Sequence, residues 1–177
     1  MNPRVSVRPA TAEDQGFLLC VYAGTRQEEM AAWGWPAAQQ AAFVQLQYLA
    51  RQRSYSTTHP SAETSVICLE KELAGSMIVS RTPDCIRLLD IALLPEYRGQ
   101  GIGSYLIRRL TAESTSTQIP LRLSVLVGSP AVRLYQRLGF VLGRQDALYC
   151  EMNYSCPRPA IAAQHSGETD PNAGEHQ

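Results

Sequence analysis

The stretch Arg-Gly-Gln-Gly-Ile-Gly at residues 98–103 decides how this sequence is interpreted. It follows a strand-like apolar run at residues 88–94 and opens a helix-like run at residues 104–110. Glycines at alternate positions remove the Cβ atoms from a turn, so backbone N–H groups can point into a concavity. The helix dipole favours negative charge at that end. The stretch therefore predicts a phosphate-binding turn between a strand and a helix.

The spacing of the glycines excludes two other phosphate-binding turns. A dinucleotide-binding turn needs Gly-x-Gly-x-x-Gly, and here the third glycine comes one residue early. A P-loop needs Gly-Lys-Ser/Thr after four spacer residues, and this turn contains no lysine. What remains is a turn of the form Arg-x-x-Gly-x-Gly directly after a strand.

Length and composition indicate one globular domain. The 177 residues suffice for a sizeable core, and 45% of them are hydrophobic and 18% charged. Lys+Arg and Asp+Glu are both 16, so the chain lacks the basic excess of a nucleic-acid binder. No apolar run approaches the roughly 20 residues of a membrane span, and the N-terminus does not resemble a signal peptide. The five cysteines form no Cys-x-x-Cys pair. We therefore expect a cytoplasmic protein without a metal, nucleic-acid or membrane partner.

Hydrophobic periodicity divides the chain into helices and strands. Strands are expected at residues 5–8, 64–70, 73–80, 85–94, 121–127, 139–142 and 147–154. Helices are expected from Thr11 onwards and at residues 28–53, 101–113 and 130–138, with a break at the Trp-Gly-Trp-Pro sequence of residues 33–36 and a polar loop at residues 114–118. Residues 155–177 are rich in proline and poor in large apolar side chains, which predicts disorder after a domain of residues 1–154.

A second motif follows about 26 residues after the glycine turn. Residues 129–140 contain Leu-Tyr-x-x-Leu-Gly-Phe at 134–140. Together the two motifs resemble the GNAT superfamily of N-acetyltransferases, and the order of elements matches from residue 5 to about 154. The resemblance implies an α/β (α+β) fold. Its mixed, mostly antiparallel sheet has about six to seven strands with one splayed pair, flanked by about four helices.

The resemblance also implies that acetyl-CoA is the co-substrate. In the family the glycine turn binds the pyrophosphate through backbone amides, and the strand before it pairs its free backbone groups with the pantetheine arm. The matching positions in this sequence are Ile91, Ala92, Leu93, Arg98, Gly99, Gln100, Gly101, Ile102, Gly103 and Ser104.

Tyr135 matches the family's tyrosine that protonates the departing thiolate. A phenol with a pKa near about 10 suits a leaving thiol with a pKa of about 8–9. Two positions depart from the family's pattern: Gly128 stands where many relatives carry an asparagine that contacts pantetheine, and Leu123 where some carry a glutamate base. Asp90, Glu96 and a water chain are the alternatives for the base.

The expected reaction is direct acetyl transfer to a primary amine of a small molecule or peptide. Two other functions stay open: transfer from a longer acyl-CoA, and an acetyl-CoA-binding sensor without turnover. Trp33 and Trp35, with Glu28 and Glu29, lie where such folds place the acceptor-binding loop. The alternative for the tryptophans is that they cap the core at the helix break. A homodimer is left open.

Overall fold

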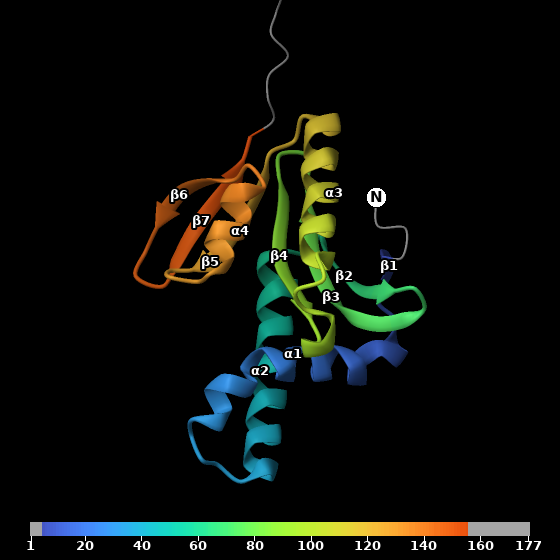
Figure 1. Ribbon diagram of the computed structural model, residues 1–177, viewed down its shortest axis with the longest axis vertical. Coiled ribbons are helices and arrows are strands. Elements are labelled where there is room, and N and C mark those ends of the chain that lie inside the picture. Colours follow the sequence, from blue (N-terminus) through green and yellow to red (C-terminus); the bar gives the residue numbers. More distant parts are fainter. Residues whose placement is uncertain (1–4, 156–177) are drawn as a thin grey trace, which may run out of the picture.

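The computed structural model describes residues 5–155, apart from the side chain of Glu28 (Figure 1). The tail for which the sequence predicts disorder is residues 155–177, and all of it beyond Ser155 lies outside the described part of the chain. The strands are β1 (Val5–Pro9), β2 (Ala62–Leu69), β3 (Glu72–Arg81), β4 (Ile86–Leu93), β5 (Leu121–Leu126), β6 (Val141–Gln145) and β7 (Tyr149–Tyr154). The helices are α1 (Gln15–Ala31), α2 (Ala37–Thr58), α3 (Ile102–Thr117) and α4 (Ala131–Arg137), with short 3-10 turns η1 (Ala12–Asp14) and η2 (Pro95–Tyr97).

The strands form one mixed sheet in the order β1-β2-β3-β4-β5-β7-β6. Five of its six neighbouring pairs are antiparallel, and only β4 and β5 run parallel. A parallel pair needs a crossover connection, and α3 supplies it between β4 and β5. The mixed, mostly antiparallel sheet expected from the sequence is confirmed.

Helices cover both faces of the sheet, as the two hydrophobic clusters show. On one face α3 packs through Ile102, Leu106, Ile107 and Leu110 against strands β3 to β5, and α4 adds Tyr135. On the other face α1 and α2 form a separate cluster over β2. In Figure 1 the tip of the α1–α2 hairpin projects below the sheet, and β5, β6 and β7 lie at the upper left and turn away from β4. No helix within residues 5–155 is long and apolar enough to cross a membrane.

β4 and β5 pair only over their first residues and then separate. Their register joins Ile86 to Leu121, Arg87 to Arg122 and Leu88 to Leu123, and ends there. β3 continues to pair with β4 as far as Leu93, and β7 continues along β5 to Leu126. We call the point where β4 and β5 separate the split. The splayed pair expected from the sequence is therefore present.

A β-bulge in β4 lies directly at the split. Ile78 of β3 pairs with Asp90 and Val79 pairs with Leu88, which leaves Leu89 as the extra residue. A bulge bends its strand and increases the local twist. It thus turns β4 away from β5 without breaking the pairing with β3.

The polar loop expected at residues 114–118 is wrong, because α3 continues to Thr117. The hydroxyls of its last turn bond to the helix's own carbonyls: Thr115 donates to Thr111 at 2.9 Å and Thr117 donates to Glu113 at 2.8 Å. Ser and Thr usually favour loops because they compete for backbone groups. Here the hydroxyls bond to the carbonyls one turn earlier, and the residues stay helical.

The connection from β1 to α1 depends on a buried carboxylate. Asp14 accepts two hydrogen bonds from the guanidinium of Arg8, both at 2.7 Å, and one from the backbone N–H of Thr11 at 2.8 Å. These contacts, the Arg8 bonds above all, hold the pKa of Asp14 well below its ordinary value of 3.8. Hydrogen bonds to the charged form stabilise the carboxylate.

We expect the substitution Asp14→Asn to lower the melting temperature at pH 7 by a few degrees. A carboxyl group whose pKa is lowered by folding stabilises the fold at every pH above its unfolded pKa of about 4. This contribution is lost as the pH falls through the folded pKa. The difference in melting temperature between the wild type and the variant should therefore shrink below about pH 4. Thermal unfolding followed by circular dichroism at several pH values checks this, and a difference independent of pH would contradict the role given to the charge.

Candidate functional site

The glycine turn, residues 98–104, lies between β4 and the first turn of α3 and leaves the amides of residues 99–104 unpaired. Gly99 and Gly101 have φ angles of 74° and 80°, in the left-handed region that side chains with a Cβ rarely adopt. The first α3 amide with a helical partner is that of Tyr105, which donates to the Gly101 carbonyl at 2.9 Å. Within the described chain, no hydrogen bond is found for the amides of residues 99–104. These donors are available to an anion at the helix N-terminus.

The space above the turn is open. A Cβ atom placed on Gly99, Gly101 or Gly103 would meet no atom within 4 Å outside the immediate chain. The glycines are thus not required by packing within the domain. They keep a solvent-exposed concavity free of side chains, which fits the close approach of a phosphate to the backbone.

Arg98 anchors the turn through its side chain. Its Nε donates to the Leu93 carbonyl at 2.9 Å and a terminal nitrogen donates to the Gly24 carbonyl of α1 at 3.1 Å. Its backbone N–H is also in use, since it donates to the carbonyl of Pro95 at 3.2 Å. Gln100 bonds to the Glu96 carbonyl at 2.8 Å. The side chains of Arg98 and Gln100 thus hold the turn against β4, η2 and α1.

Beyond the split, β4 is paired on one side only. Ile91, Ala92 and Leu93 pair with β3 and have no partner from β5. Alternate backbone groups of this segment therefore face the space between the separated strands β4 and β5, which we call the gap, without a sheet partner. At the bulge, the hydroxyl of Tyr55 from α2 donates to the Leu89 carbonyl at 3.3 Å. The free edge of β4 leads directly into the glycine turn.

Tyr135 lies on α4 and belongs to the core cluster on the α3 face, with 9% of its surface exposed. Its ring packs edge-on against Phe140, with ring centroids 5.6 Å apart. Burial raises the pKa of Tyr135 above the ordinary 10.0, and the negative charge of Asp90 raises it further. The phenol thus keeps its proton at neutral pH, as a proton donor must.

Asp90 follows the bulge and faces the α1–α2 side of the sheet. Its carboxylate lies 3.2 Å from a guanidinium nitrogen of Arg51, whose own guanidinium lies over the ring of Tyr22 at 4.5 Å. Burial raises the pKa of Asp90, and the positive charge of Arg51 opposes that rise. Glu96, the other acid singled out in the sequence, is exposed on η2 beside the glycine turn.

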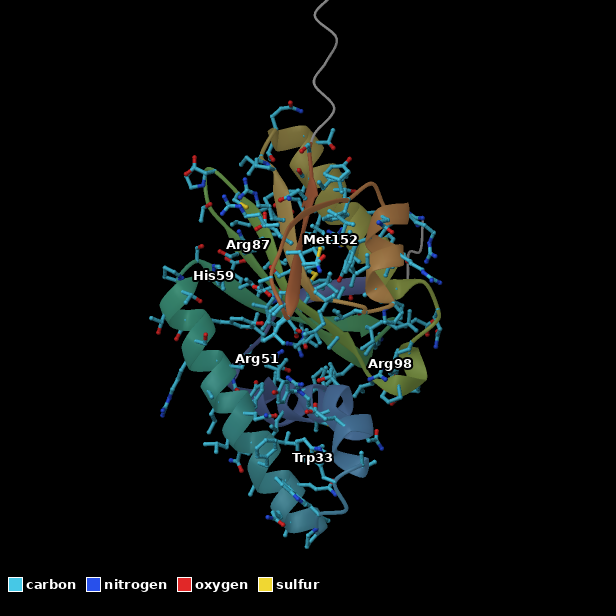
Figure 2. The ribbon with its side chains drawn as sticks, turned by 90° about the vertical axis from the view of Figure 1, so that its left-hand side faces the viewer. Trp33, Arg51, His59, Arg87, Arg98 and Met152 are labelled. Carbon is cyan, nitrogen blue, oxygen red and sulfur yellow. The ribbon has the colours of Figure 1, made fainter. Side chains whose placement is uncertain are left out.

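A pocket that the sequence did not indicate opens on the α2 side of the split. We call it the α2-side pocket; its volume is about 380 Å³. Its lining residues come from α2, β4, β5 and the β6–β7 loop: Tyr55, His59, Arg87, Leu88, Leu89, Ser124, Asp146 and Tyr149. Figure 2 shows His59 and Arg87 near the C-terminal end of α2. Only the length and direction of α2 bring His59 there, and no sequence pattern marks it.

The residue that faces this pocket from β5 is Ser124. Leu123, the position matched to the base of some relatives, is 1% exposed and belongs to the core on the α3 face. Side chains alternate along a strand, so only one of the two can face the pocket.

Burial lowers the pKa of His59, and the charge of Arg87 lowers it further.

The two tryptophans pack against Phe43 at the tip of the α1–α2 hairpin. Trp33 and Trp35 have ring centroids 4.9 Å apart, and each lies edge-on to Phe43 at 5.4 and 5.5 Å. Figure 2 shows Trp33 far from Arg87 and His59. The aromatic cluster thus closes the hairpin where proline interrupts the helical region.

The described part of the chain contains no cluster of side chains that could bind a metal ion. Among residues 5–155, no three His, Cys, Asp or Glu side chains come together as a metal ion would require. The cysteines of that part are free thiols: Cys20, Cys68, Cys85 and Cys150.

Residues 60–142 match the family model described as the acetyltransferase (GNAT) domain. The matched span contains the split, the glycine turn and Tyr135. No curated protein matches the sequence significantly.

Many solved structures share the fold. PaiA N-acetyltransferase from Thermoplasma acidophilum, in complex with coenzyme A, is 19% identical with a TM-score of 0.63, over 85% of this chain and 98% of that one. An acetyltransferase from Thermus thermophilus is 17% identical with a TM-score of 0.62, over 87% and 98%. A GNAT acetyltransferase from Elizabethkingia anophelis with acetyl-CoA bound is 15% identical with a TM-score of 0.55, over 86% and 99%. At these identities the likeness concerns the fold.

Proposed function

We propose that this chain transfers an acetyl group from acetyl-CoA directly to a primary amine of a small molecule or peptide, because residues 60–142 match the acetyltransferase (GNAT) domain model. One observation carries the proposal: an open glycine turn, a strand edge without a partner and a buried tyrosine border the same gap. Each alone has a structural explanation. Their convergence at one split is what a thioester substrate with a long phosphate-bearing arm requires.

The residues present fit acetyl-CoA. The amides of Gly99, Gly101, Ile102 and Gly103 hold the pyrophosphate at the N-terminus of α3, where the dipole favours anions. The backbone of residues 91–93 pairs with the amide-containing pantetheine arm, as a further strand would. The bound co-substrate supplies the activated acetyl thioester, and its reactive end comes to lie at the split. Arg98 keeps the turn and the strand end in register through the Leu93 carbonyl.

Tyr135 completes the reaction as the general acid. As the amine nitrogen bonds to the acetyl carbon and the carbon–sulfur bond breaks, Tyr135 gives its phenolic proton to the departing thiolate. The attacking nitrogen then carries one proton more than the amide product, releases it to solvent, and Tyr135 regains a proton from solvent. An unpaired backbone N–H of β4 faces the carbonyl oxygen, where negative charge develops, and stabilises it. The ammonium of the acceptor must lose a proton before it attacks. Of the groups lining the α2-side pocket, His59 is the candidate to accept that proton, since its imidazole lines the pocket and its pKa is lowered by partial burial and by the charge of Arg87.

The decisive experiment separates binding from turnover. Acetyl-CoA is titrated into the protein by calorimetry, and release of free thiol is then followed with a broad panel of amines and peptides. We expect binding, thiol release that depends on the amine, and a product whose mass has increased by that of one acetyl group. A repeat with longer acyl-CoA donors compares the efficiency of acyl chains of different length.

Each alternative gives a different result. Binding without turnover on any amine or peptide would favour the sensor, and faster turnover with a longer acyl donor would favour another acyltransferase. Absence of acetyl-CoA binding would overturn the proposal and both alternatives, because all three place the pyrophosphate on the glycine turn.

A further inference from the structure

Two arginines lie next to each other on the α2 face of the sheet, at the split. Arg87 of β4 and Arg122 of β5 are register partners in the short parallel pairing. Their neighbours Leu88 and Leu123 are buried on the α3 face, so both arginine side chains leave the sheet on the α2 side. Adjacent strands are about 4.8 Å apart, and like charges directly opposite each other destabilise a sheet. We call these two residues the arginine pair.

No ion pair neutralises the arginine pair within residues 5–155. The ion pairs found there involve other arginines: Arg8, Arg26, Arg51 and Arg81. Asp146 lines the same pocket as Arg87, but its Oδ1 accepts the backbone N–H groups of Leu148 at 2.8 Å and Tyr149 at 2.7 Å. These bonds lower the pKa of Asp146 and tie its carboxylate to the β6–β7 turn.

The arginine pair lies between two adjoining hollows. Arg87 lines the α2-side pocket together with His59 and Ser124. Arg122 lines an open hollow of about 660 Å³ over β5, β6 and β7, to which Arg144 and Glu151 also contribute. Ser124 and Arg122 are on the same face of β5, and Ser124 is the register partner of Glu151, so the two hollows lie side by side on this face with one arginine of the pair in each. A group bound between the two guanidinium ions would therefore lie beside the split, on the face opposite α3.

From this geometry we infer that the acceptor amine also carries an oxyanion, a carboxylate or a phosphate, which binds between Arg87 and Arg122. The inference rests on the proposed function and names its class of acceptor. Guanidinium groups present paired N–H donors that match both oxyanions, and an oxyanion between them removes the repulsion within the pair. The amine of the same molecule then extends through the α2-side pocket toward the acetyl group.

The test compares matched amines on wild-type protein and single variants. One series sets ω-amino carboxylates of increasing chain length against their uncharged amides, and another sets phosphoethanolamine against ethanolamine. We expect the wild type to favour an oxyanion-bearing acceptor in kcat/KM by about tenfold or more, as a charge-assisted hydrogen bond provides. Arg87→Gln and Arg122→Gln should each remove most of that preference, chiefly through the acceptor KM. The two series distinguish carboxylate from phosphate.

Arg53→Gln is the matched control, because Arg53 is an exposed arginine of α2 outside both hollows. It removes the same charge and should leave the preference unchanged. Equal kcat/KM for charged and uncharged partners in the wild type would overturn the inference, and so would a preference that survives both glutamine substitutions. In either case the proposed function stands, since acetyl transfer has been observed.

A binding measurement covers the case in which no amine of the panel is acetylated. Inorganic phosphate is titrated into the protein saturated with coenzyme A, and arginine side-chain signals are followed by NMR. Saturable binding in the wild type that is lost in the Arg87→Gln/Arg122→Gln double variant supports the oxyanion site. No saturable phosphate binding under these conditions would overturn it, whereas failure to bind coenzyme A would be a failure of the proposed function.

Discussion

Replacing Tyr135 by phenylalanine is expected to lower kcat by about 10²- to 10³-fold, within the range that general acid catalysis contributes. The ring is 9% exposed and packs on Phe140, so phenylalanine preserves the packing and removes only the hydroxyl. Without a proton donor, the sulfur of coenzyme A must leave as an unprotonated thiolate. The affinity for acetyl-CoA, measured by calorimetry, should change less than about twofold, because the pyrophosphate and pantetheine contacts lie elsewhere.

Tyr154→Phe is the matched control for that experiment. Tyr154 also packs against Phe140, with ring centroids 5.6 Å apart, but its hydroxyl lies 3.3 Å from the hydroxyl of Thr115 at the far end of α3. We expect kcat to stay within about twofold of the wild type. A Tyr135→Phe variant that is as active as Tyr154→Phe would show that Tyr135 is a packing residue. In that case solvent would protonate the thiolate.

Gly101→Ala should weaken acetyl-CoA binding by about tenfold or more. Gly101 has a φ angle of 80°, and this left-handed conformation costs a residue with a Cβ about 1–2 kcal/mol. Relaxation of that strain would rotate the amides at the start of α3 away from the pyrophosphate. The new methyl group also projects into a concavity that the protein leaves open, where no atom lies within 4 Å. A calorimetric titration of acetyl-CoA measures the loss.

The control is Gly16→Ala in α1, where the added Cβ also has no atom within 4 Å and the φ angle is not left-handed. Alanine there should stabilise the helix by up to about 1 kcal/mol and leave the dissociation constant of acetyl-CoA unchanged. Unaltered binding in Gly101→Ala, with a melting temperature close to the wild type, would contradict the assignment of the pyrophosphate to this turn.

Local patterns in the sequence predicted most of the fold. The alternating period located the strands to within about three residues, and the proline at residue 36 located the break between α1 and α2. The helical boundaries were less accurate: α1 continues to Ala31 without a break near residue 28, and α2 ends at Thr58, five residues past the expected end at residue 53. The end of α3 was missed because Thr115 and Thr117 are typical loop residues by composition. Their hydroxyls bond to the preceding helical turn instead, and such a bond can be recognised only when the backbone conformation is known.

The α2 side of the site could not be predicted in the same way. His59 and Arg87 are 28 positions apart and belong to no motif, so nothing in their local sequence brings them together. Likewise, Arg122 is an ordinary exposed strand residue until the register of β4 against β5 sets it opposite Arg87. Contacts of this kind depend on where a whole helix or strand ends, which many distant packing interactions determine together.

Short-range geometry made it possible to predict from the sequence a glycine turn between β4 and α3 and a short helix that carries Tyr135. A left-handed φ favours glycine, and a helix N-terminus offers free amides wherever it occurs. The tertiary structure alone decided that β4 leaves β5 after Leu88, that the pocket beyond the split is lined by Ser124 and not Leu123, and that two arginines of the described chain meet there without an ion-pair partner. The physical reason is that strand register and helix placement follow from burial over the entire core, and a shift of one residue would exchange the two faces of a strand.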